Sequence, residues 1–266
     1  MHMYQVDAFT DKPFTGNPAA VLILNNWPSN ALMQAIAFEN NLPETAYTKS
    51  RSDGAWDLRW FSPTQEVDFC GHATLATAHI LFTTREIPAD IIFHTKVGKL
   101  IVSKTEQGYR LSIPRLEPEL VEQAPHEITE LFSSISITVF RDIFNYYIDI
   151  GSSQAVRDFV PNMTIIERLG QIGLVITGVC LPEEQGDFVS RSFAPGVGIP
   201  EDPVTGSTHA TLVPYWAEKL GRCKLLAYQA SKRGGWLNCE LSSDQVMLEG
   251  KAVTFMEANI FLDNRV

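Results

Sequence analysis

An internal repeat is the feature that most constrains how this chain can fold. Gly, Arg, Phe and Pro recur at an offset of 132 residues, and the tetrapeptide His-Ala-Thr-Leu recurs at an offset of 137 residues. The two matches come in the same order at almost the same offset, so they predict two domains of one fold, related by a pseudo-twofold axis. The first copy comprises Gly54, Arg59–Pro63 and His72–Leu75, and the second comprises Gly186, Arg191–Pro195 and His209–Leu212.

The boundary between the two halves is expected in a segment rich in Pro and Glu, residues 114–125. We therefore expect a first domain over residues 1–115, completed by a C-terminal strand within residues 253–266, and a second domain over residues 116–252. Ligand pockets often lie at domain interfaces, so the active site is expected in the cleft between the halves.

Short β-rich runs bounded by turn residues outnumber the helical segments. Such runs are typical of strands. Helices are isolated among the strands instead of alternating with them regularly, which predicts an α+β fold. The predicted strands include residues 19–24, 91–93, 100–102 and 174–177.

Three helical segments are expected. Ser29 is a suitable N-cap for a helix over residues 30–40. Two further helices are expected to begin near Gly71 and Gly206, because Ala and Leu follow each glycine. The apolar side of the first helix is expected to carry Leu32, Ile36 and Phe38.

Composition narrows the possible partners. The chain has 21 basic and 31 acidic residues, a formal charge of −10 and no Lys/Arg-rich run, which argues against nucleic acid. No apolar run approaches the roughly 20 residues of a membrane span. The first residues lack the order of a signal peptide, so a cytoplasmic protein is expected. The four cysteines show no CxxC spacing, so the sequence suggests neither a zinc site nor a disulfide framework.

Two glycine-bearing helix starts predict a clamp for an anion. A helix start offers unpaired backbone N–H groups and a partial positive charge, which suit a carboxylate or phosphate. One start lies in the segment Asp68–Thr74 and the other in Pro200–His209. A pseudo-twofold axis would point both into one cleft. Taken singly, the first segment could be a capped helix with a core cysteine, and Asp202 could merely cap a turn.

Glu44 is the candidate acid/base. It follows the helix over residues 30–40, stands beside Pro43 and leads into an apolar strand. A carboxylate among Leu, Pro and Ala is expected to be partly withdrawn from water, which favours proton transfer near neutral pH. By itself, however, Glu44 would be interpreted as a solvated loop carboxylate or a helix cap.

Four segments, found in this order, resemble the signature segments of the phenazine-biosynthesis-like (PhzF-like) family. Each fragment is short, but the combination is specific, and the matching blocks run from about residue 5 to residue 210. The segments are Thr15–Val21, Leu42–Ala46, Phe69–Thr74 and Glu201–Ser207.

This resemblance implies the diaminopimelate epimerase-like fold: two pseudo-symmetric domains, each a nearly closed β-sheet barrel around a central helix. It implies an isomerase that moves a proton on carbon of a small anionic carboxylate, with no cofactor and no metal. A homodimer is the expected assembly. Glu44 is implied as the acid/base, with Asp202 and His72 as further catalytic residues. Substrate binding is implied for Asn17, Cys70, Gly71, Gly206 and Ser207.

The chain departs from the two-thiol epimerases, and this leaves alternatives open. Cys70 stands in the first thiol-bearing segment, but Asp202 occupies the corresponding region of the second. One alternative is an epimerase or racemase that uses Cys70 with Asp202 or Glu44. Another is a cysteine hydrolase that uses Cys70 and His72. The third is a non-catalytic protein that binds a small molecule.

Overall fold

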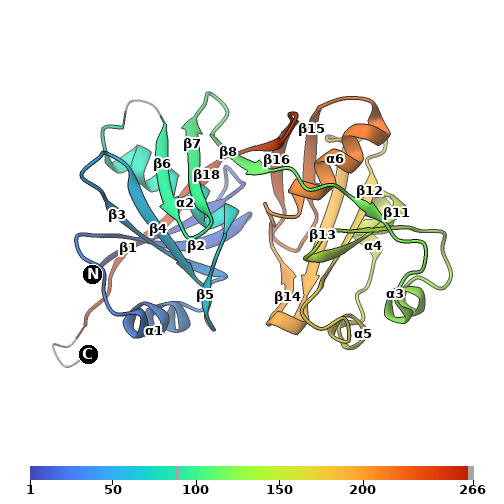
Figure 1. Cartoon of the computed structure of the whole chain (residues 1–266), viewed down its shortest axis with the longest axis horizontal. Helices are drawn as coiled ribbons and strands as arrows, with labels where there is room; N and C mark the ends of the chain where they lie inside the picture. The colour runs from blue at the N-terminus through green and yellow to red at the C-terminus, as the bar shows by residue number, and fades with distance from the viewer. Residues whose placement is uncertain (88–89, 263–266) are drawn as a thin grey trace. The chain divides into compact units, whose positions relative to one another are not determined.

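The computed structural model describes residues 1–87 and 90–262 of the chain, and it has an α+β fold of mixed sheets with a few helices (Figure 1). The chain divides into two compact units. One comprises Met1–Ile113 with Leu248–Val266, and the other Pro114–Met247. Among the described residues, no helix has both the length and the apolar character needed to cross a bilayer.

The first unit is built on a continuous mixed sheet. Its strands pair in the order β18–β1–β2–β3–β4–β6–β7–β8, and short β5 pairs with β4. The β2–β3 and β4–β6 pairs are parallel and the others are antiparallel. The elements are β1 (His2–Ala8), β2 (Asn17–Leu24), α1 (Asn30–Asn40), β3 (Glu44–Ser50), β4 (Trp56–Phe61), β5 (Glu66–Val67), α2 (Gly71–Thr84), β6 (Ile91–Thr95), β7 (Gly98–Lys104), β8 (Tyr109–Pro114) and β18 (Ala252–Asn259).

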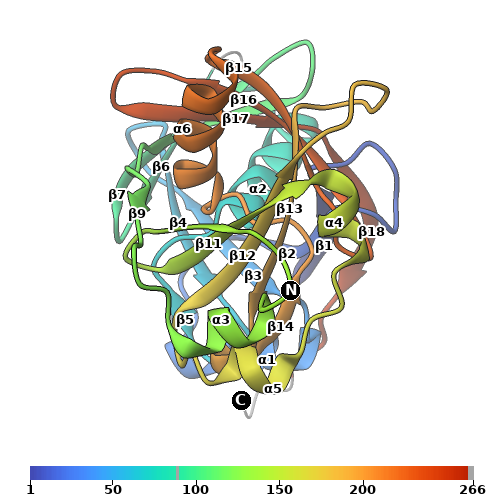
Figure 2. The same cartoon turned by 90° about the vertical axis from the view of Figure 1, so that its right-hand side faces the viewer.

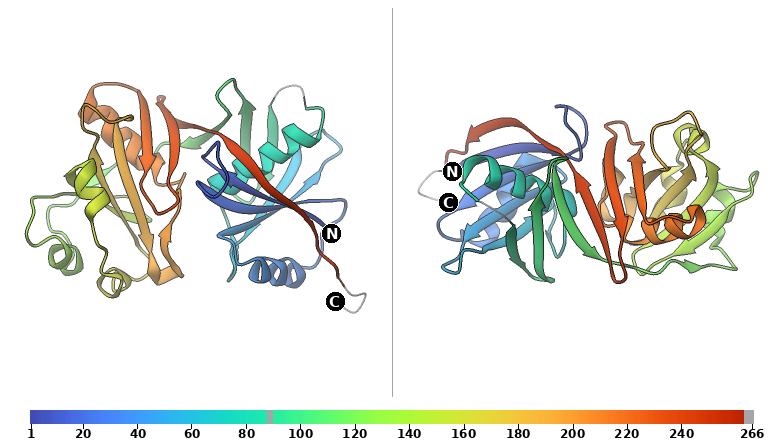
Figure 3. Two further views of the ribbon diagram at one scale, coloured as in Figure 1. Left: turned by 180° about the vertical axis from the view of Figure 1, so that it is seen from behind. Right: turned by 90° about the horizontal axis from the view of Figure 1, so that it is seen from above.

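Two helices use this sheet differently. Helix α1 is amphipathic and packs Met33, Ile36 and Ala37 against side chains of β2, β3 and β4. Helix α2 is buried from Gly71 to Phe82, which is expected of a helix that is apolar on every side. It packs against β1, β2, β3 and the C-terminal strand β18. Figure 3 shows β18, drawn in red, running beside β1, so the first and last strands of the chain are neighbours.

The second unit is also built on a mixed arrangement of strands. Its strands pair in the order β9–β10–β11–β12–β13–β15–β16, and β14 also pairs with β13. The elements are β9 (Glu119–Leu120), α3 (His126–Leu131), β10 (Thr138–Arg141), β11 (Asn145–Ser152), α4 (Ser153–Asp158), α5 (Met163–Glu167), β12 (Gly173–Val179), β13 (Phe188–Ala194), the 3₁₀ turn η1 (Pro195–Val197), β14 (Ile199–Asp202), α6 (His209–Leu220), β15 (Lys224–Gln229) and β16 (Gly235–Leu241). Strand β17 (Gln245–Gly250) crosses the boundary, and its last three residues belong to the first unit.

Helices also cover this sheet. Ile128 of α3, Val156 of α4 and Ile166 of α5 share one apolar core with β11, β12 and β13, and Figure 2 shows α4 lying in front of these strands. Side chains at alternate positions of β12 point to the opposite face of the sheet. There the indole N–H of Trp216 on α6 donates to Thr177 Oγ1 at 2.9 Å, and the Trp216 ring stacks on Phe188. The sheet therefore has apolar contacts on both faces.

The order and direction of strand pairing in the second unit repeat those of the first. In both, two parallel strands (β2–β3, β11–β12) are followed by an antiparallel strand (β4, β13), which then pairs with a short strand (β5, β14). The next helix leads to a strand (β6, β15) that pairs in parallel with that antiparallel strand, β4 or β13. The repeated His-Ala-Thr-Leu tetrapeptides lie at the starts of helices α2 and α6.

The structure confirms the helix predicted over residues 30–40 and differs from the sequence-based predictions in two details. The helix spans Asn30–Asn40, and Ser29 Oγ accepts from the backbone N–H of Leu32 as an N-cap. Phe38 was expected on the apolar face, but it is 68% exposed. The reason is that residues two apart on a helix face opposite sides, so burying Ile36 turns Phe38 outward.

The start of α6 is the second difference. The helix begins at His209, three residues after Gly206. The backbone N–H groups of His209 and Ala210 bond to the carbonyls of Gly206 and Ser207, three residues back, which is the tighter 3₁₀ pattern. The glycine therefore opens a turn that leads into the helix. By contrast, α2 begins at Gly71 as predicted.

Candidate active site

Four of the predicted site residues come together at one edge of the first unit. Asn17 begins β2 and Glu44 begins β3, and these strands are parallel, so both residues lie at the same end of the sheet. Helix α2 begins at that end, with Cys70 as its N-cap residue and His72 in its first turn. Parallel pairing and the helix start therefore position all four side chains.

His72 is the centre of this cluster. Its Nε2 lies 3.1 Å from Glu44 Oε2. On the other side of the ring, Asn17 Nδ2 donates to Nδ1 at 3.2 Å. The Cys70 sulfur lies 3.5 Å from Nδ1 and 3.9 Å from Nε2. Since Nδ1 accepts from Asn17, the neutral imidazole carries its proton on Nε2, facing the Glu44 carboxylate.

Burial sets the protonation of the cluster. The His72 side chain is 6% exposed and that of Glu44 is 12% exposed. Burial, reinforced by the negative charge of Glu44, raises the pKa of the Cys70 thiol to about 11. Burial alone would lower the pKa of His72, but Cys70 and Glu44 raise it, and the net direction is upward from the ordinary value. Near neutral pH the Cys70 thiol is therefore neutral, and the raised pKa of His72 favours the protonated ring.

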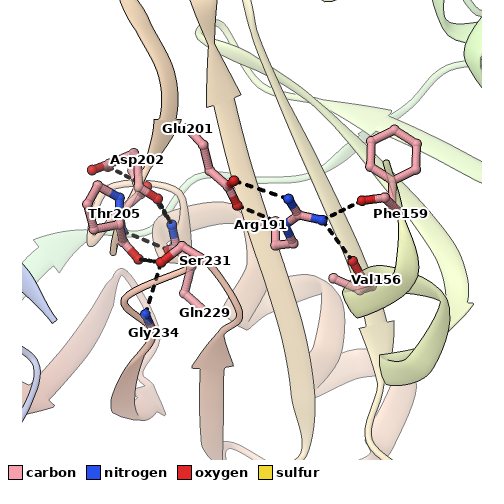
Figure 4. Close-up of polar contacts among 10 residues, drawn as sticks. Val156, Phe159, Arg191, Glu201, Asp202, Thr205, Gln229, Ser231 and Gly234 are labelled. Atoms are coloured by element: carbon pink, nitrogen blue, oxygen red, sulfur yellow. Dashed lines mark hydrogen bonds and ion pairs between the residues drawn. The ribbon is translucent and has the colours of Figure 1, made fainter. Parts of the chain in front are cut away.

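Asp202 lies in the second unit, at the end of β14, in a turn with a side-chain network of its own (Figure 4). Thr205 Oγ1 donates to Asp202 Oδ2 at 2.5 Å. The buried amide of Gln229 donates to Asp202 O at 2.9 Å and to Thr205 Oγ1 at 3.0 Å, and its oxygen accepts from Thr205 N at 2.7 Å. Every polar atom of the Gln229 side chain is therefore used to hold this turn.

The hairpin between β15 and β16 also contacts the turn. Ser231 Oγ donates to the carbonyl of Pro203 at 2.7 Å and accepts from Gly234 N at 3.0 Å (Figure 4). Gly234 has a φ of +67°, and an added Cβ would lie 2.1 Å from Tyr228 Oη. A glycine is thus required for this tight approach. Gly206 and Ser207 follow the turn directly, Gly206 buried and Ser207 exposed.

Each unit also has a bidentate arginine–glutamate pair next to its candidate residues. In the first, Arg59 Nε and Nη2 donate to the two oxygens of Glu66 at 2.8 and 2.9 Å. In the second, Arg191 Nε and Nη2 donate to Glu201 at 2.8 and 3.1 Å (Figure 4). Arg59 and Arg191 are the repeated arginines of the sequence. They fix the strand that precedes each turn.

The structure thus places Asn17, Glu44, Cys70 and His72 in one cluster, with Gly71 in the helix turn that carries it. It places Asp202, Gly206 and Ser207 in a separate turn of the other unit. Sequence reasoning missed Thr205 and Gln229. Thr205 stands three residues after Asp202, a spacing that permits a local side-chain bond. Gln229 carries no local signal, because it reaches the turn from a strand far along the chain.

Known proteins resemble this chain over nearly its whole length. Residues 6–258 match the family model described as phenazine biosynthesis-like protein. An uncharacterized isomerase from Halalkalibacterium halodurans is 44% identical over 262 residues, with 98% of each chain covered.

Solved structures give the same result. The crystal structure of a PhzF-family phenazine biosynthesis protein from Enterococcus faecalis is 38% identical, covers 98% of this chain and 99% of its own, and superposes with a TM-score of 0.92. A probable proline racemase from Agrobacterium radiobacter, 10% identical, covers 98% of this chain and 93% of its own with a TM-score of 0.68, so the likeness to it is one of fold alone. The fold is therefore of the epimerase-like α+β type, and the chain belongs to the phenazine biosynthesis-like (PhzF-like) family and is an isomerase.

Proposed function

We propose that this chain isomerises a small carboxylate by moving a proton on carbon, with Glu44 as the acid/base and without a cofactor. One observation carries the proposal: the Glu44 carboxylate is almost buried and lies 3.1 Å from His72 Nε2. A carboxylate held by an imidazole at the start of a helix can take a proton from carbon and return it. The resemblance to the PhzF-like family supports the same role.

The neighbouring thiol favours Glu44 over Cys70 as the proton acceptor. With the pKa of Cys70 raised to about 11, the thiol stays protonated near neutral pH and is a poor base or nucleophile. This weakens both the thiol-dependent epimerase and the cysteine hydrolase, each of which requires a thiolate. The carboxylate needs no such activation.

The reaction would use the cluster in the following way. Glu44 removes a proton α or γ to the substrate carboxylate and returns it elsewhere on the same π-system. His72 holds Glu44 in place and can relay the proton. The first helical bond of α2 runs from Thr74 N to Cys70 O, so the N–H groups of Gly71 and His72 precede the helical ladder and suit an anion. Acid/base groups of this kind typically contribute about 10²–10⁴-fold each.

We assign Asp202, Gly206 and Ser207 to the same reaction, on the ground of the family motif that they match. Asp202 would orient the substrate or relay a proton, and Gly206 and Ser207 would bind the carboxylate. We also propose that each sheet nearly closes around its central helix, α2 or α6, in two pseudo-symmetric domains. The repeated pairing order and the burial of both helices support this.

The experiment is hydrogen–deuterium exchange at carbon. The protein is incubated in deuterated water with a panel of small unsaturated and α-substituted carboxylates, and products are followed by mass spectrometry and NMR. Deuterium that appears at a new carbon, together with a moved double bond, supports the proposal. Exchange at a single centre with inversion would favour the Cys70 epimerase, and ligand binding without exchange would favour the non-catalytic alternative.

A further inference from the structure

The cluster around His72 also presents three different metal-binding atoms. Glu44 offers a carboxylate oxygen, Cys70 a sulfur and His72 an imidazole nitrogen, and these atoms all lie within 4.8 Å of one another. The sequence spacing gave no sign of this, because Glu44 comes from a different strand.

The Glu44 and His72 atoms are already spaced for a small divalent cation. Metal–ligand bonds of ~2.3 Å to sulfur and ~2.0–2.1 Å to nitrogen or oxygen, in a tetrahedron, separate the ligand atoms by roughly 3.4–3.6 Å. Here Nε2 and the Glu44 oxygen are 3.1 Å apart, and the Cys70 sulfur and Nε2 are 3.9 Å apart. The Glu44 oxygen and Nε2 therefore need to move by only a few tenths of an ångström. The Cys70 sulfur lies nearer Nδ1, at 3.5 Å, so it has to turn toward Nε2 by rotation about the Cα–Cβ bond of Cys70.

Glu44 Oε2 is available for such a cation, and Nε2 and the Cys70 sulfur become available once each gives up its proton. Glu44 Oε2 is buried and accepts no hydrogen bond of normal geometry from the described residues, despite its proximity to His72. A buried carboxylate oxygen in this state gains most from a cation. Asn17 occupies Nδ1 of His72, so Nε2 is the nitrogen that faces the other two ligands. With the imidazole proton on Nδ1, the Asn17 amide can turn its oxygen to accept it and so orient the ring.

We propose that Glu44, Cys70 and His72 form a binding site for a borderline-soft divalent cation, represented by Zn²⁺, with a fourth position open to water. Mixed sulfur, nitrogen and oxygen ligands select zinc or cobalt over magnesium or calcium. Binding forms the metal–sulfur, metal–nitrogen and metal–oxygen bonds. It releases the thiol proton to solvent, together with the second imidazole proton where His72 is protonated, so it involves no redox step. Since the cation occupies Glu44, it inhibits proton transfer; this consequence alone depends on the proposed function.

Cobalt(II) is the probe, because a cobalt–thiolate bond absorbs in the near ultraviolet and can be titrated without any substrate. The full chain, freed of metal, should bind one Co²⁺ with a sulfur-to-cobalt band that Zn²⁺ abolishes. Cys70→Ser should remove the band and weaken Co²⁺ binding. Loss of a residue that only hydrogen-bonds to a metal ligand typically weakens binding by about 10–100-fold, and loss of the ligand Cys70 should exceed this. The matched control is Cys223→Ser, which changes an exposed free cysteine and should leave the band intact.

His72→Gln and Glu44→Gln give independent arms, should Cys70→Ser fail to fold. Each should weaken Co²⁺ binding while circular dichroism stays that of the parent protein. Absence of the band in the parent, or a band that persists in Cys70→Ser and disappears in Cys223→Ser, overturns the metal site. Cobalt binding is measured separately from catalysis. Cobalt binding without carbon exchange would refute only the proposed function. Carbon exchange that is insensitive to Zn²⁺, in a protein without a cobalt band, would refute only the metal site.

Discussion

The two units share one order of strand pairing but place their carboxylates at different points in it. In the first unit, the residue after Glu44 pairs with Phe61, and in the second, the residue after Gly173 pairs with Phe193. Phe61 and Phe193 are repeat counterparts, so Glu44 corresponds to a glycine. The scaffold is duplicated, but the carboxylate proposed as the acid/base is not.

The same comparison applies to the other carboxylate. Asp202 pairs with the residue before Phe193, and Val67 pairs with the residue before Phe61. Asp202 therefore corresponds to an apolar residue. Each unit thus carries a carboxylate that its counterpart lacks.

The repeated histidines show how surroundings decide chemistry. His72 and His209 occupy the same place in the repeated tetrapeptide, and both are buried. Glu44 and Cys70 raise the pKa of His72, whereas burial lowers the pKa of His209 to about 4. His209 Nδ1 donates to Thr205 O at 2.9 Å and its ring packs at Phe188, so it is a neutral structural residue.

The largest expected effect on stability comes from breaking the arginine pairs. Arg191→Met should lower the free energy of unfolding by about 3 kcal/mol, because it leaves the partly buried Glu201 carboxylate without its partner and removes the donor to the carbonyls of Val156 and Phe159. Arg59→Met should cost less, since Lys96 Nζ remains 3.1 Å from Glu66. Urea unfolding of both variants measures the difference, and equal losses would show that the two pairs are energetically equivalent.

A somewhat smaller loss of stability is expected when the pH is lowered. The folded pKa of His209, about 4, lies below its ordinary value of 6.5, so the unfolded chain binds more protons between these pH values. Its contribution is complete above pH 6.5 and declines as the pH falls toward 4, by up to about 3 kcal/mol. His209→Asn keeps a donor near Nδ1 but cannot titrate, so the unfolding free energy of this variant should depend less on pH over that range. An unchanged slope would mean that His209 is not responsible.

The smallest effect concerns the repeated glycines. Gly54 has a φ of +82° with nothing within 4 Å of an added Cβ, whereas Gly186 has a φ of +109° with Leu226 O and Trp236 both 3.2 Å away. Gly54→Ala should cost about 1 kcal/mol from backbone strain alone, and Gly186→Ala about 2 kcal/mol. Thermal unfolding tests the ranking, and a larger loss for Gly54→Ala would contradict it.

Local signals in the sequence predicted much of this structure. The Ser29 cap, the β-rich runs and the start of α2 at Gly71 are set by neighbouring residues, and all were predictable. The exposure of Phe38 was not predictable, because the helix has more apolar residues than its buried face can hold. The sequence also pointed to Glu44, Cys70, His72 and Asn17, but their distances arise from parallel pairing of β2 and β3.

The residues that sequence reasoning missed depend on contacts between distant segments. Gln229 holds the Asp202 turn from the end of β15, and no spacing rule predicts that contact. Likewise, the three metal-binding atoms become neighbours only once β3 and α2 are assembled. The roles proposed for Glu44 and Asp202 rest on this geometry and on the family resemblance, and both remain predictions.

The most direct test compares Glu44→Gln with Cys70→Ser in the carbon-exchange assay, using a carboxylate that the parent protein turns over. Glutamine keeps the size of the side chain but cannot accept a proton, so Glu44→Gln should reduce exchange by about 10²–10⁴-fold with ligand affinity largely retained. Cys70→Ser should have a much milder effect, because the thiol is already protonated. A Glu44→Gln variant that remains active beside an inactive Cys70→Ser variant would contradict the assignment and favour a thiol-dependent epimerase.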